Sequence, residues 1–307
     1  MARACVFAPA PILTVTAEDV DGRTDLHLHA GGQGVWIGRL VAELGVDVRL
    51  CGAFGGETGR VVRCLLEQER LDLTVVEVRS ANGAYVHDRR SGDRREVAAM
   101  APGPLSRHDL DELYGATVTT ALGTDVCVLA GPGSDDVVPA DVYRRLAGDL
   151  VANGRTVVAD LSGDLLAAVV DAGAAALKVS HEELVSDGRA RDDSTEALLG
   201  AIAAMARRTG GLVVCTRAGE PSLAVVGDRT LEVSAPRLEA VESRGAGDSF
   251  TAGLAVGLAD GLPVEDALCL GAAAGALNVT RRGLGSGRRA QVEGLVQHVS
   301  VRELDRR

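Results

Sequence analysis

The feature that most constrains the fold is a regular alternation of helical and strand-like segments after Leu105. Four helical patterns each precede a short apolar run: residues 106–122 and 126–130, 139–152 and 155–160, 164–173 and 175–179, and 193–209 and 211–216. Runs such as Thr156-Val157-Val158-Ala159 have no polar face, as is typical of strands inside a parallel sheet. The alternation therefore predicts an α/β fold in which helices cover both faces of a mainly parallel sheet.

The first hundred residues contain a second kind of strand. Residues 4–8 form an apolar run like the later ones, but segments at about 10–30 and 72–99 alternate between apolar and polar residues. Alternation is typical of strands with one exposed face and does not suit the interior of a parallel sheet. We therefore predict that these two segments form a small β-sheet lid, inserted in a single domain of residues 1–307.

Composition argues against several classes of function. The net charge of -11 and the aromatic content of 2% are unlike a nucleic-acid-binding protein, which needs basic patches and stacking rings. Lys178 is the only lysine, so the GxxxxGK[ST] phosphate-binding loop cannot occur. Six cysteines without CxxC spacing favour reduced, buried thiols over a zinc site or disulfides.

The sequence also argues against membrane insertion and secretion. No apolar run approaches the roughly 20 residues that a membrane-spanning helix needs. The chain enters its first strand-like run without the layout of a signal peptide. We therefore expect a cytoplasmic protein with neither a membrane nor a nucleic acid as partner.

The stretch from Glu242 to Gly253 is a candidate phosphoryl-transfer site. Small residues from Gly245 to Gly247 leave backbone amides uncovered just before a helical run of small apolar residues. Free amides and the positive end of a helix dipole together attract anions. Asp248, in the first turn, could take a proton from a hydroxyl held beside such an anion. It could equally do no more than cap the helix, as aspartate often does.

The residues Gly245-Ala246-Gly247-Asp248-Ser249-Phe250, followed by Ala252-Gly253, resemble the C-terminal signature of the PfkB (ribokinase-like) carbohydrate kinases. The resemblance extends over nearly the whole chain. In that family the glycine loop is the anion hole for the transferred phosphate, and its aspartate is the catalytic base. These roles carry over to Gly245, Ala246 and Gly247 as the anion hole and to Asp248 as the base.

The resemblance implies a ribokinase-like three-layer α/β/α domain with a mainly parallel sheet and a small β-sheet lid. It also implies a kinase that phosphorylates a hydroxyl of a sugar or sugar phosphate, with ATP and Mg²⁺. One departure lies beside the loop, where Glu242-Ser243-Arg244 replaces the usual Asp-Thr-x of the family.

A nucleotide site is implied by three further stretches. Residues 178–184 are similar to the family's Lys-Pro-Asn-x-x-Glu-Leu, in which the Asn and Glu hold the magnesium–phosphate assembly through water. Ser180 replaces the Asn, and Glu183 matches the Glu as a water-mediated magnesium ligand, although a Ser–Glu pair at this spacing also fits a helix capping box. Residues 216–219 occupy the place of the loop along the nucleotide phosphates and ribose, and residues 271–278 resemble the wall of the adenine pocket. Close helix packing is the alternative for that last stretch. The implied nucleotide-binding residues are Lys178, Ser180, Glu183, Thr216, Arg217, Gly219, Gly275 and Asn278.

The acceptor end departs further from the family. The nearest branch is that of the 1-phosphofructokinases and tagatose-6-phosphate kinases, which begins Asn-Pro-Ala-Leu-Asp, with the aspartate on the sugar hydroxyls. Thr14 stands in place of that aspartate, and Gln33 and Trp36 replace the Lys and Asn of the signature Gly-Gly-Lys-Gly-x-Asn. The branch's Arg-x-Asn-x-Lys lid motif falls on residues 82–86. The implied substrate-binding residues are Thr14, Gly31, Gly32, Gln33, Trp36, Asn82 and Tyr85.

These departures leave the acceptor open. A sugar phosphate remains possible if other arginines bind its phosphate; Arg89, Arg90, Arg94 and Arg95 lie nearby, although a charged run at a hairpin tip is usually solvated. The alternatives are an unphosphorylated sugar, a nucleoside or another small alcohol, or a non-catalytic sugar or nucleotide sensor. Because lid strands in relatives often pair between subunits, a homodimer through the lid is also expected.

Overall fold

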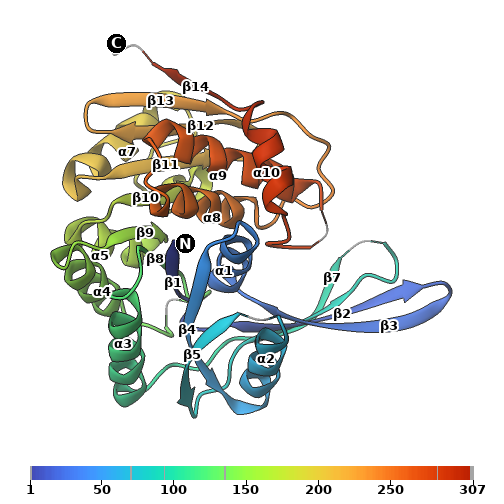
Figure 1. Cartoon of the computed structure of the whole chain (residues 1–307). Helices are drawn as coiled ribbons and strands as arrows, with labels where there is room; N and C mark the ends of the chain where they lie inside the picture. The colour runs from blue at the N-terminus through green and yellow to red at the C-terminus, as the bar shows by residue number, and fades with distance from the viewer. Residues whose placement is uncertain (1, 70, 93, 135, 282, 305–307) are drawn as a thin grey trace.

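A ten-stranded sheet and a separate four-stranded sheet organise the part of the chain that the computed structural model describes, residues 2–69, 71–92, 94–134, 136–281 and 283–304 (Figure 1). Along the larger sheet the order is β14-β13-β12-β11-β10-β9-β8-β1-β4-β5. The strands from β5 to β11 in this order pair in parallel, and β12, β13 and β14 extend the sheet with antiparallel pairs. The bounds are β1 Arg3–Phe7, β4 Asp47–Gly55, β5 Asp72–Val78, β8 Val126–Ala130, β9 Thr156–Asp160, β10 Ala176–Ser180, β11 Leu212–Arg217, β12 Glu220–Val226, β13 Arg229–Ser234 and β14 Ser300–Glu303.

Helices cover both faces of this sheet (Figure 1). One face packs against α3 (Arg107–Ala121), α4 (Ala140–Ala152), α5 (Gly163–Ala172) and α7 (Thr195–Thr209). The other packs against α1 (Gln33–Glu43), α8 (Ala246–Ala259), α9 (Val264–Val279) and α10 (Arg289–Val296). Two further helices are α2 (Gly56–Gln68), beneath the smaller sheet, and the short α6 (His181–Ser186), directly after β10. The predicted three-layer α/β/α fold with a mainly parallel sheet is confirmed.

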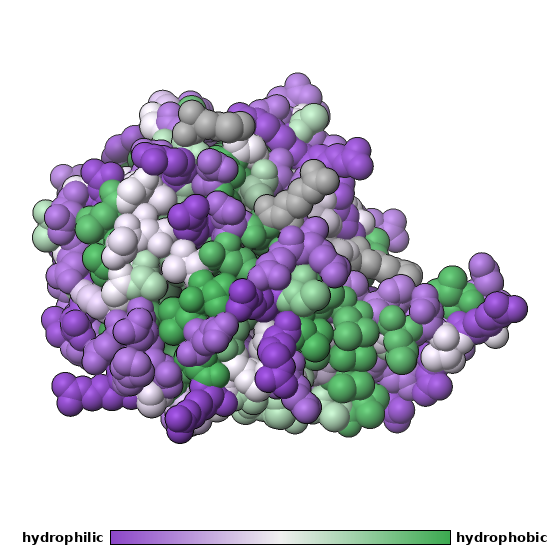
Figure 2. All heavy atoms as spheres, turned by 60° about the horizontal axis from the view of Figure 1, so that its bottom comes forward, coloured by the Kyte–Doolittle hydropathy of each residue, from purple (hydrophilic) through white to green (hydrophobic). Residues whose placement is uncertain are grey.

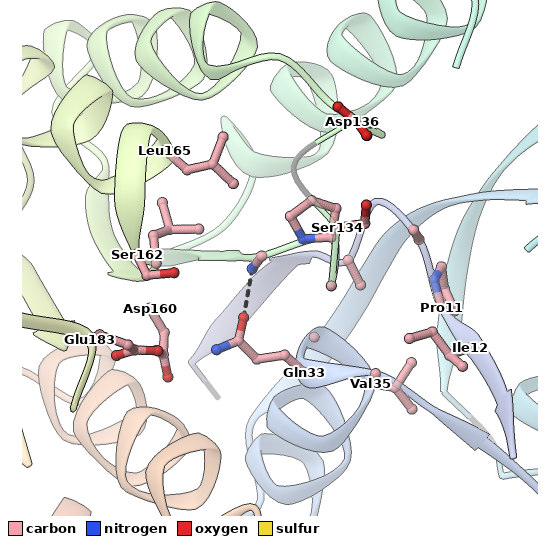
Figure 3. Close-up of a pocket in the computed structure, with 18 residues that line it drawn as sticks. Pro11, Ile12, Gln33, Val35, Ser134, Asp136, Asp160, Ser162, Leu165 and Glu183 are labelled. Carbon is pink, nitrogen blue, oxygen red and sulfur yellow. Dashed lines mark hydrogen bonds between the residues drawn. The ribbon is translucent and has the colours of Figure 1, made fainter. Parts of the chain in front are cut away.

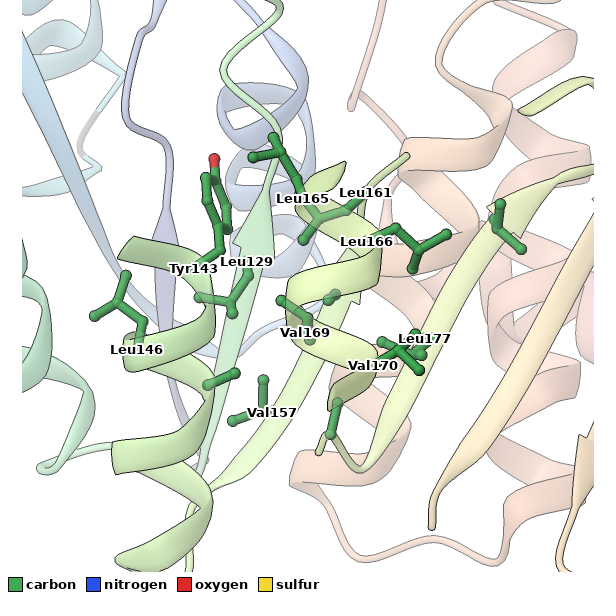
Figure 4. Close-up of a cluster of buried hydrophobic side chains, with 14 of the residues drawn as sticks. Leu129, Tyr143, Leu146, Val157, Leu161, Leu165, Leu166, Val169, Val170 and Leu177 are labelled. Atoms are coloured by element: carbon green, nitrogen blue, oxygen red, sulfur yellow. The ribbon is translucent and has the colours of Figure 1, made fainter. Parts of the chain in front are cut away.

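The two cores explain why the central strands are apolar throughout. In β8, Cys127 and Leu129 belong to the core under α4 and α5, whereas Val126, Val128 and Ala130 belong to the core under α1 and α8. Figure 4 shows the first core, in which Leu129 and Val157 of the sheet face side chains of α4 and α5. Each residue of such a strand is buried on one face or the other, so alternation is lost.

The smaller sheet has the order β3-β2-β6-β7 and extends away from the body as the lid (Figure 1). Its strands are β2 (Ile12–Val20), β3 (Arg23–Gly31), β6 (Ala84–Asp88) and β7 (Arg95–Met100). The prediction for the first lid segment is confirmed, but part of the second is wrong. β5, which alternation assigned to the lid, pairs in parallel with β4 at the edge of the large sheet.

The sequence analysis missed the β12–β13 hairpin and β14. The hairpin turn is Gly227-Asp228, a pair typical of a tight connection between antiparallel strands. β14 pairs with β13 from the far end of the chain, a partnership that no local pattern signals. None of the helices in the described ranges is long and apolar enough to span a membrane.

Close contact between α8 and α9 sets the position of the helix that begins with the glycine loop. A Cβ atom added to Gly253 would lie 2.6 Å from the carbonyl oxygen of Leu270, and one added to Gly271 would lie 2.9 Å from that of Phe250. Real Cβ atoms do not approach a carbonyl oxygen so closely, so both positions require glycine.

We expect Gly253→Ala to destabilise the fold by about 1–3 kcal/mol, because the added methyl group must push α9 away from α8. Gly200→Ala is the matched control. Gly200 is an exposed residue of α7 with no atom within 4 Å of an added Cβ, so alanine should be neutral or stabilising by up to about 1 kcal/mol. Urea unfolding measures both free energies, and equal effects would contradict the packing explanation.

Candidate active site

A cavity of about 650 Å³ opens beyond the carboxyl ends of β1, β8 and β9, beside the N-terminus of α1 (Figure 3). Ligands of parallel sheets bind at this edge, where the strand ends and the following loops supply polar groups. In Figure 3 the Asp160 and Glu183 side chains lie close together on one side of the cavity, with the amide of Gln33 facing them. The polar side chains that line the cavity are those of Gln33, Ser134, Asp136, Asp160, Ser162 and Glu183.

Asp248 lies in the first turn of α8, close enough to Gln33 and Asp160 for both to influence its pKa, but it is not among the residues that line the cavity. Gly245 is the N-cap of this helix, with a left-handed φ of 72°, and no side chain caps the helix end. The alternative that Asp248 serves only as a cap is therefore wrong. Its half-buried carboxylate is placed at the positive end of the helix dipole, next to the amides of the glycine loop.

The surroundings of Asp248 prepare it to take up a proton near neutral pH. Burial raises the pKa of its carboxyl to about 7, and the negative charge of Asp160 contributes to the rise. Lys178 and a hydrogen bond from the Gln33 side chain act in the opposite direction, but they do not cancel the effect. A general base works best when its pKa lies near the working pH.

A buried ion pair joins two strands to α8 under the glycine loop. Lys178 Nζ, from β10, lies 3.1 Å from Oδ1 of Asp160, from β9, and both side chains are almost fully buried. The hydroxyl of Thr251 in α8 donates to the other Asp160 oxygen at 2.6 Å. Burial disfavours the charged form of Lys178, but the carboxylates around it, Asp160 first, raise its pKa above the ordinary value.

Gly247 allows this lysine to reach the loop. A Cβ atom at Gly247 would lie 2.7 Å from Lys178 Nζ, so the ammonium group touches the backbone of the predicted anion hole. The sequence analysis selected Lys178 but gave no role to Asp160. The available signal was an aspartate at the end of an otherwise apolar strand, where an uncompensated charge would be costly to bury.

Ser180 and Glu183 form the capping box that their spacing allowed. The Ser180 hydroxyl accepts from the amide of Glu183 at 3.2 Å, and Glu183 Oε2 accepts from the amide of Ser180 at 2.7 Å. Glu183 also lines the cavity, so capping does not remove it from the site. Its magnesium role stays a prediction. The described part of the chain contains no group of three or more His, Cys, Asp or Glu residues placed to hold a metal ion.

Thr216, Arg217 and Gly219 lie at the turn between β11 and β12, next to Ser180. Thr216 is opposite Ser180 in the register of β10 and β11, and its carbonyl oxygen is 3.4 Å from Nδ1 of His181. Ala218, within the turn, has a positive φ of 47°, which alanine rarely adopts. Their place at the carboxyl edge suits the predicted nucleotide loop, and their contact with nucleotide stays a prediction.

Asn278 and Gly275 of α9 contact the glycine loop itself. The Asn278 amide donates to the carbonyl oxygen of Arg244 at 2.7 Å and accepts from the hydroxyl of Ser249 at 3.2 Å. A Cβ atom at Gly275 would lie 3.0 Å from the carbonyl oxygen of Ala246. The alternative of close helix packing therefore applies to this stretch, and the adenine-pocket role stays a prediction.

The predicted acceptor residues fall into three groups. Gly32 and Gln33 line the cavity, and Gln33 Oε1 accepts from the amide of Gly131 at 2.6 Å (Figure 3). Thr14, Gly31 and Trp36 form a cluster beside it: a Cβ atom on Gly31 would lie 3.2 Å from the Thr14 hydroxyl and 3.5 Å from the Trp36 ring.

The side chains of Asn82 and Tyr85 contact other residues of the protein. The Asn82 side chain is buried, donates to the carbonyl oxygens of Pro11 and Ala53, and accepts from the amide of Gly55. It thereby ties the start of the lid to the end of β4. Tyr85 stacks on His87, with ring centroids 5.9 Å apart. Neither residue lines the cavity, and their substrate roles stay predictions.

Comparison with known proteins identifies the family. The family model described as "pfkB family carbohydrate kinase" matches residues 9–290. The chain belongs to the pfkB family of carbohydrate kinases. It is therefore a kinase that uses ATP as co-substrate, and the sensor interpretation is set aside.

Individual relatives agree with this membership. A 1-phosphofructokinase of Bacillus subtilis (strain 168) is 27% identical over 260 residues, covering 84% of this chain and 84% of the relative. A 1-phosphofructokinase of Vibrio cholerae is 28% identical over 283 residues, covering 90% and 87%. Among solved structures, the tetrameric inhibited form of phosphofructokinase-2 from Escherichia coli shares the fold, with a TM-score of 0.84 at 20% identity over 97% of this chain and 99% of that chain.

The pKa of Asp248 generates a test. If Asp248 is the base, activity should rise as pH increases through about 7, because the carboxylate form must be free to accept the proton. Asp160→Asn removes the neighbouring negative charge, so the pKa of Asp248 should fall and the midpoint of kcat/KM should move to lower pH. Asp136→Asn changes a carboxylate that lines the same cavity, and it should leave the midpoint in place. Equal shifts in the two variants would contradict the assignment.

Proposed function

We propose that this kinase transfers the γ-phosphoryl group of ATP to a hydroxyl of a sugar phosphate, with Asp248 as the catalytic base. The observation that carries the proposal is the position of Asp248, in the first turn of α8, beside a glycine loop that a buried lysine touches. Its pKa of about 7 and the hydrogen bond from the Gln33 side chain support the same role. Fructose 1-phosphate and tagatose 6-phosphate are the first acceptors to try, since the relatives include 1-phosphofructokinases.

In this mechanism the acceptor hydroxyl lies against Asp248, which accepts its proton as the oxygen attacks the γ-phosphorus. The bond from this phosphorus to the bridging oxygen breaks, and ADP leaves. The amides of Gly245, Ala246 and Gly247 donate to the oxygens of the transferred group, where negative charge must be stabilised. Lys178 adds a positive charge directly beneath the loop. Because these groups are fixed by α8, β9 and β10, little reorganisation accompanies the transfer.

The nucleotide would lie along the ends of β10 and β11, beside Ser180, Thr216 and Gly219. Glu183 fits a magnesium ion held through water, because its carboxylate faces the cavity and only its Oε2 is used by the capping box. Bound magnesium would neutralise charge on the phosphates during transfer.

An unphosphorylated acceptor is the second candidate. Gln33 and Thr14 are neutral where the family carries a lysine and an aspartate, and Gln33 uses its side-chain oxygen on the Gly131 amide. A site without these charges is suited to a neutral sugar, a nucleoside or another small alcohol. ATP consumption across a panel of phosphorylated and unphosphorylated acceptors separates the two candidates.

We predict that Asp248→Asn lowers kcat by about 10²–10⁴ while leaving nucleotide affinity unchanged, because only proton transfer is removed. The variant should also be more stable than the wild type at pH 8. The raised pKa means that the folded state disfavours the ionised carboxyl. Most of this penalty is gone by pH 4, close to the ordinary pKa of 3.8, because the folded state is then protonated and the unfolded state is partly protonated. Coupled ATP turnover and thermal unfolding at both pH values test the prediction. Near-normal turnover of the variant would contradict the role of Asp248 as the base.

We also propose a homodimer formed through the lid. One face of the lid is apolar: Val15 is opposite Leu28 and Val86, and Val86 is opposite Ala98. Leu26 and Leu28 are 61% and 45% exposed. In Figure 2 apolar side chains gather where the lid leaves the body. Exposed apolar strand faces of this kind favour pairing with another protein, and a second copy presents the same face.

Leu28→Glu should therefore convert the dimer to a monomer, because the carboxylate would be buried without a partner in the paired lids. Light scattering after size exclusion gives the mass of each variant. Leu122→Glu, at an exposed position at the end of α3, introduces the same side chain far from the lid and should leave the mass unchanged. A wild-type monomer at micromolar concentration would contradict the proposal.

A further inference from the structure

Three arginines gather between the lid and the loop that precedes α8. Arg89 and Arg94 lie in the connection between β6 and β7, and Arg244 directly precedes Gly245. Arg94 is half-buried, and burial followed by the like charges of Arg244 and Arg89 lowers its pKa. The carboxylates of Glu242 and Glu96 act in the opposite direction without cancelling the effect. The like charges of Arg244 and Arg89 therefore act on Arg94 more strongly than the carboxylates of Glu242 and Glu96 do.

The arginines of the hairpin differ in their partners. Arg90 and Arg95 are exposed and both pair with Asp88, as expected for a solvated hairpin tip. Arg89 pairs instead with Glu242, in the loop before α8, at 3.3 Å and with Glu18, in β2 of the lid, at 3.9 Å. Within the described residues, no carboxylate lies within ion-pair distance of Arg94 or Arg244.

His87 holds Arg94 in place. Its ring is 4% exposed, and its Nε2 lies 2.6 Å from Nη2 of Arg94. A guanidinium group can only donate, so Nε2 must accept and the ring proton must be on Nδ1. Burial and the nearby charge of Arg94 lower the pKa of His87, which keeps the ring neutral for this purpose.

This arrangement leaves a buried donor unused. Nδ1 of His87 has no hydrogen-bond partner among the described residues. Buried polar groups without a hydrogen-bond partner are rare in native proteins, and each one calls for an explanation. Here the neutral ring fixes the direction of an arginine that itself lacks a carboxylate partner.

We propose that Arg94, Arg244 and Arg89 form a binding site for the phosphate group of the acceptor; this rests on the function proposed above. A phosphate dianion matches the planar fork of a guanidinium and would supply the missing counter-charge for Arg94 and Arg244. The Arg89–Glu242 ion pair joins the lid to the loop, so both sides of the site are held together. Arg244 is four residues before Asp248, which places the anion beside the loop that carries the base.

Steady-state kinetics with Arg94→Gln and Arg244→Gln test the site. Each variant should raise KM for a sugar phosphate at least about tenfold, as expected for the loss of one hydrogen bond between charged groups. KM for ATP, and kcat, should stay within about threefold of the wild type. Arg95→Gln is the matched control, since it removes the same charge one residue away and should leave all three constants unchanged. The acceptors are fructose 1-phosphate, fructose 6-phosphate and tagatose 6-phosphate, with fructose as the unphosphorylated reference.

Other results would overturn the assignment. If the variants raised KM for ATP and left KM for the acceptor unchanged, the arginines would bind the phosphates of the nucleotide. An equal effect of Arg95→Gln would reduce the site to general surface charge. If the enzyme phosphorylated fructose but neither bound nor phosphorylated any sugar phosphate, the phosphate-binding site would be refuted and the kinase function would stand.

Calorimetry without ATP separates the site from catalysis. The wild-type protein could bind a sugar phosphate but turn over none of the panel. If Arg94→Gln then abolished that binding, the result would support the site and refute the proposed reaction. No binding of any phosphorylated member of the panel would refute the site.

The positioning role of His87 has its own readout. His87→Phe keeps the ring volume but cannot accept from Arg94, so it should raise KM for the sugar phosphate without lowering kcat. His87→Gln restores an acceptor and should recover part of the loss. A fall in kcat in both variants would indicate a structural role only.

Discussion

The buried ion pair between Lys178 and Asp160 is the interaction on which the site depends. Its two residues are opposite each other on adjacent parallel strands, Asp160 at the end of β9 and Lys178 within β10, and the Thr251 hydroxyl extends the network into α8. Removing one partner would leave a charge buried without compensation, a loss of several kcal/mol in most proteins. The pair therefore fixes the first turn of α8 against the sheet. The same Asp160 charge helps to raise the pKa of Asp248, so one contact both holds the glycine loop and tunes the carboxyl that we propose as the base.

Residues whose role depends on local pattern could be predicted from the sequence. The parallel strands from β8 to β11 were predicted within one or two residues, because burial on both faces leaves a continuous apolar run. The first lid hairpin and the glycine loop before α8 are equally local, since alternation and small residues before a helix carry their own signal. The capping box at Ser180 and Glu183 belongs to the same class.

Residues whose role depends on distant partners could not be predicted. Asn82 fits a substrate motif by position, yet its amide bonds to backbone atoms of Pro11 and Ala53, far away in the chain. β5 alternates like a lid strand because it is at the edge of the large sheet, where one face is only partly covered. Likewise, four arginines of one hairpin look alike in the sequence. Asp88 pairs with two of them, whereas Arg89 pairs with Glu242 of the loop before α8 and Arg94 contacts the ring of His87.

If Asp248 is the base, as we propose, the effect of charge on its pKa explains together why residue 33 is the neutral Gln33 and why Arg94 has no carboxylate partner among the described residues. A lysine at position 33 would lie beside Asp248, where a second cation would lower the pKa of the carboxyl further than Lys178 already does. An amide at this place still donates to Asp248 and still binds the Gly131 amide through its oxygen. In the proposed site, positive charge for an anionic acceptor comes instead from Arg94 of the lid and from Arg244. Such a division would let the site bind a dianion without making the carboxyl of Asp248 too acidic to accept a proton at neutral pH.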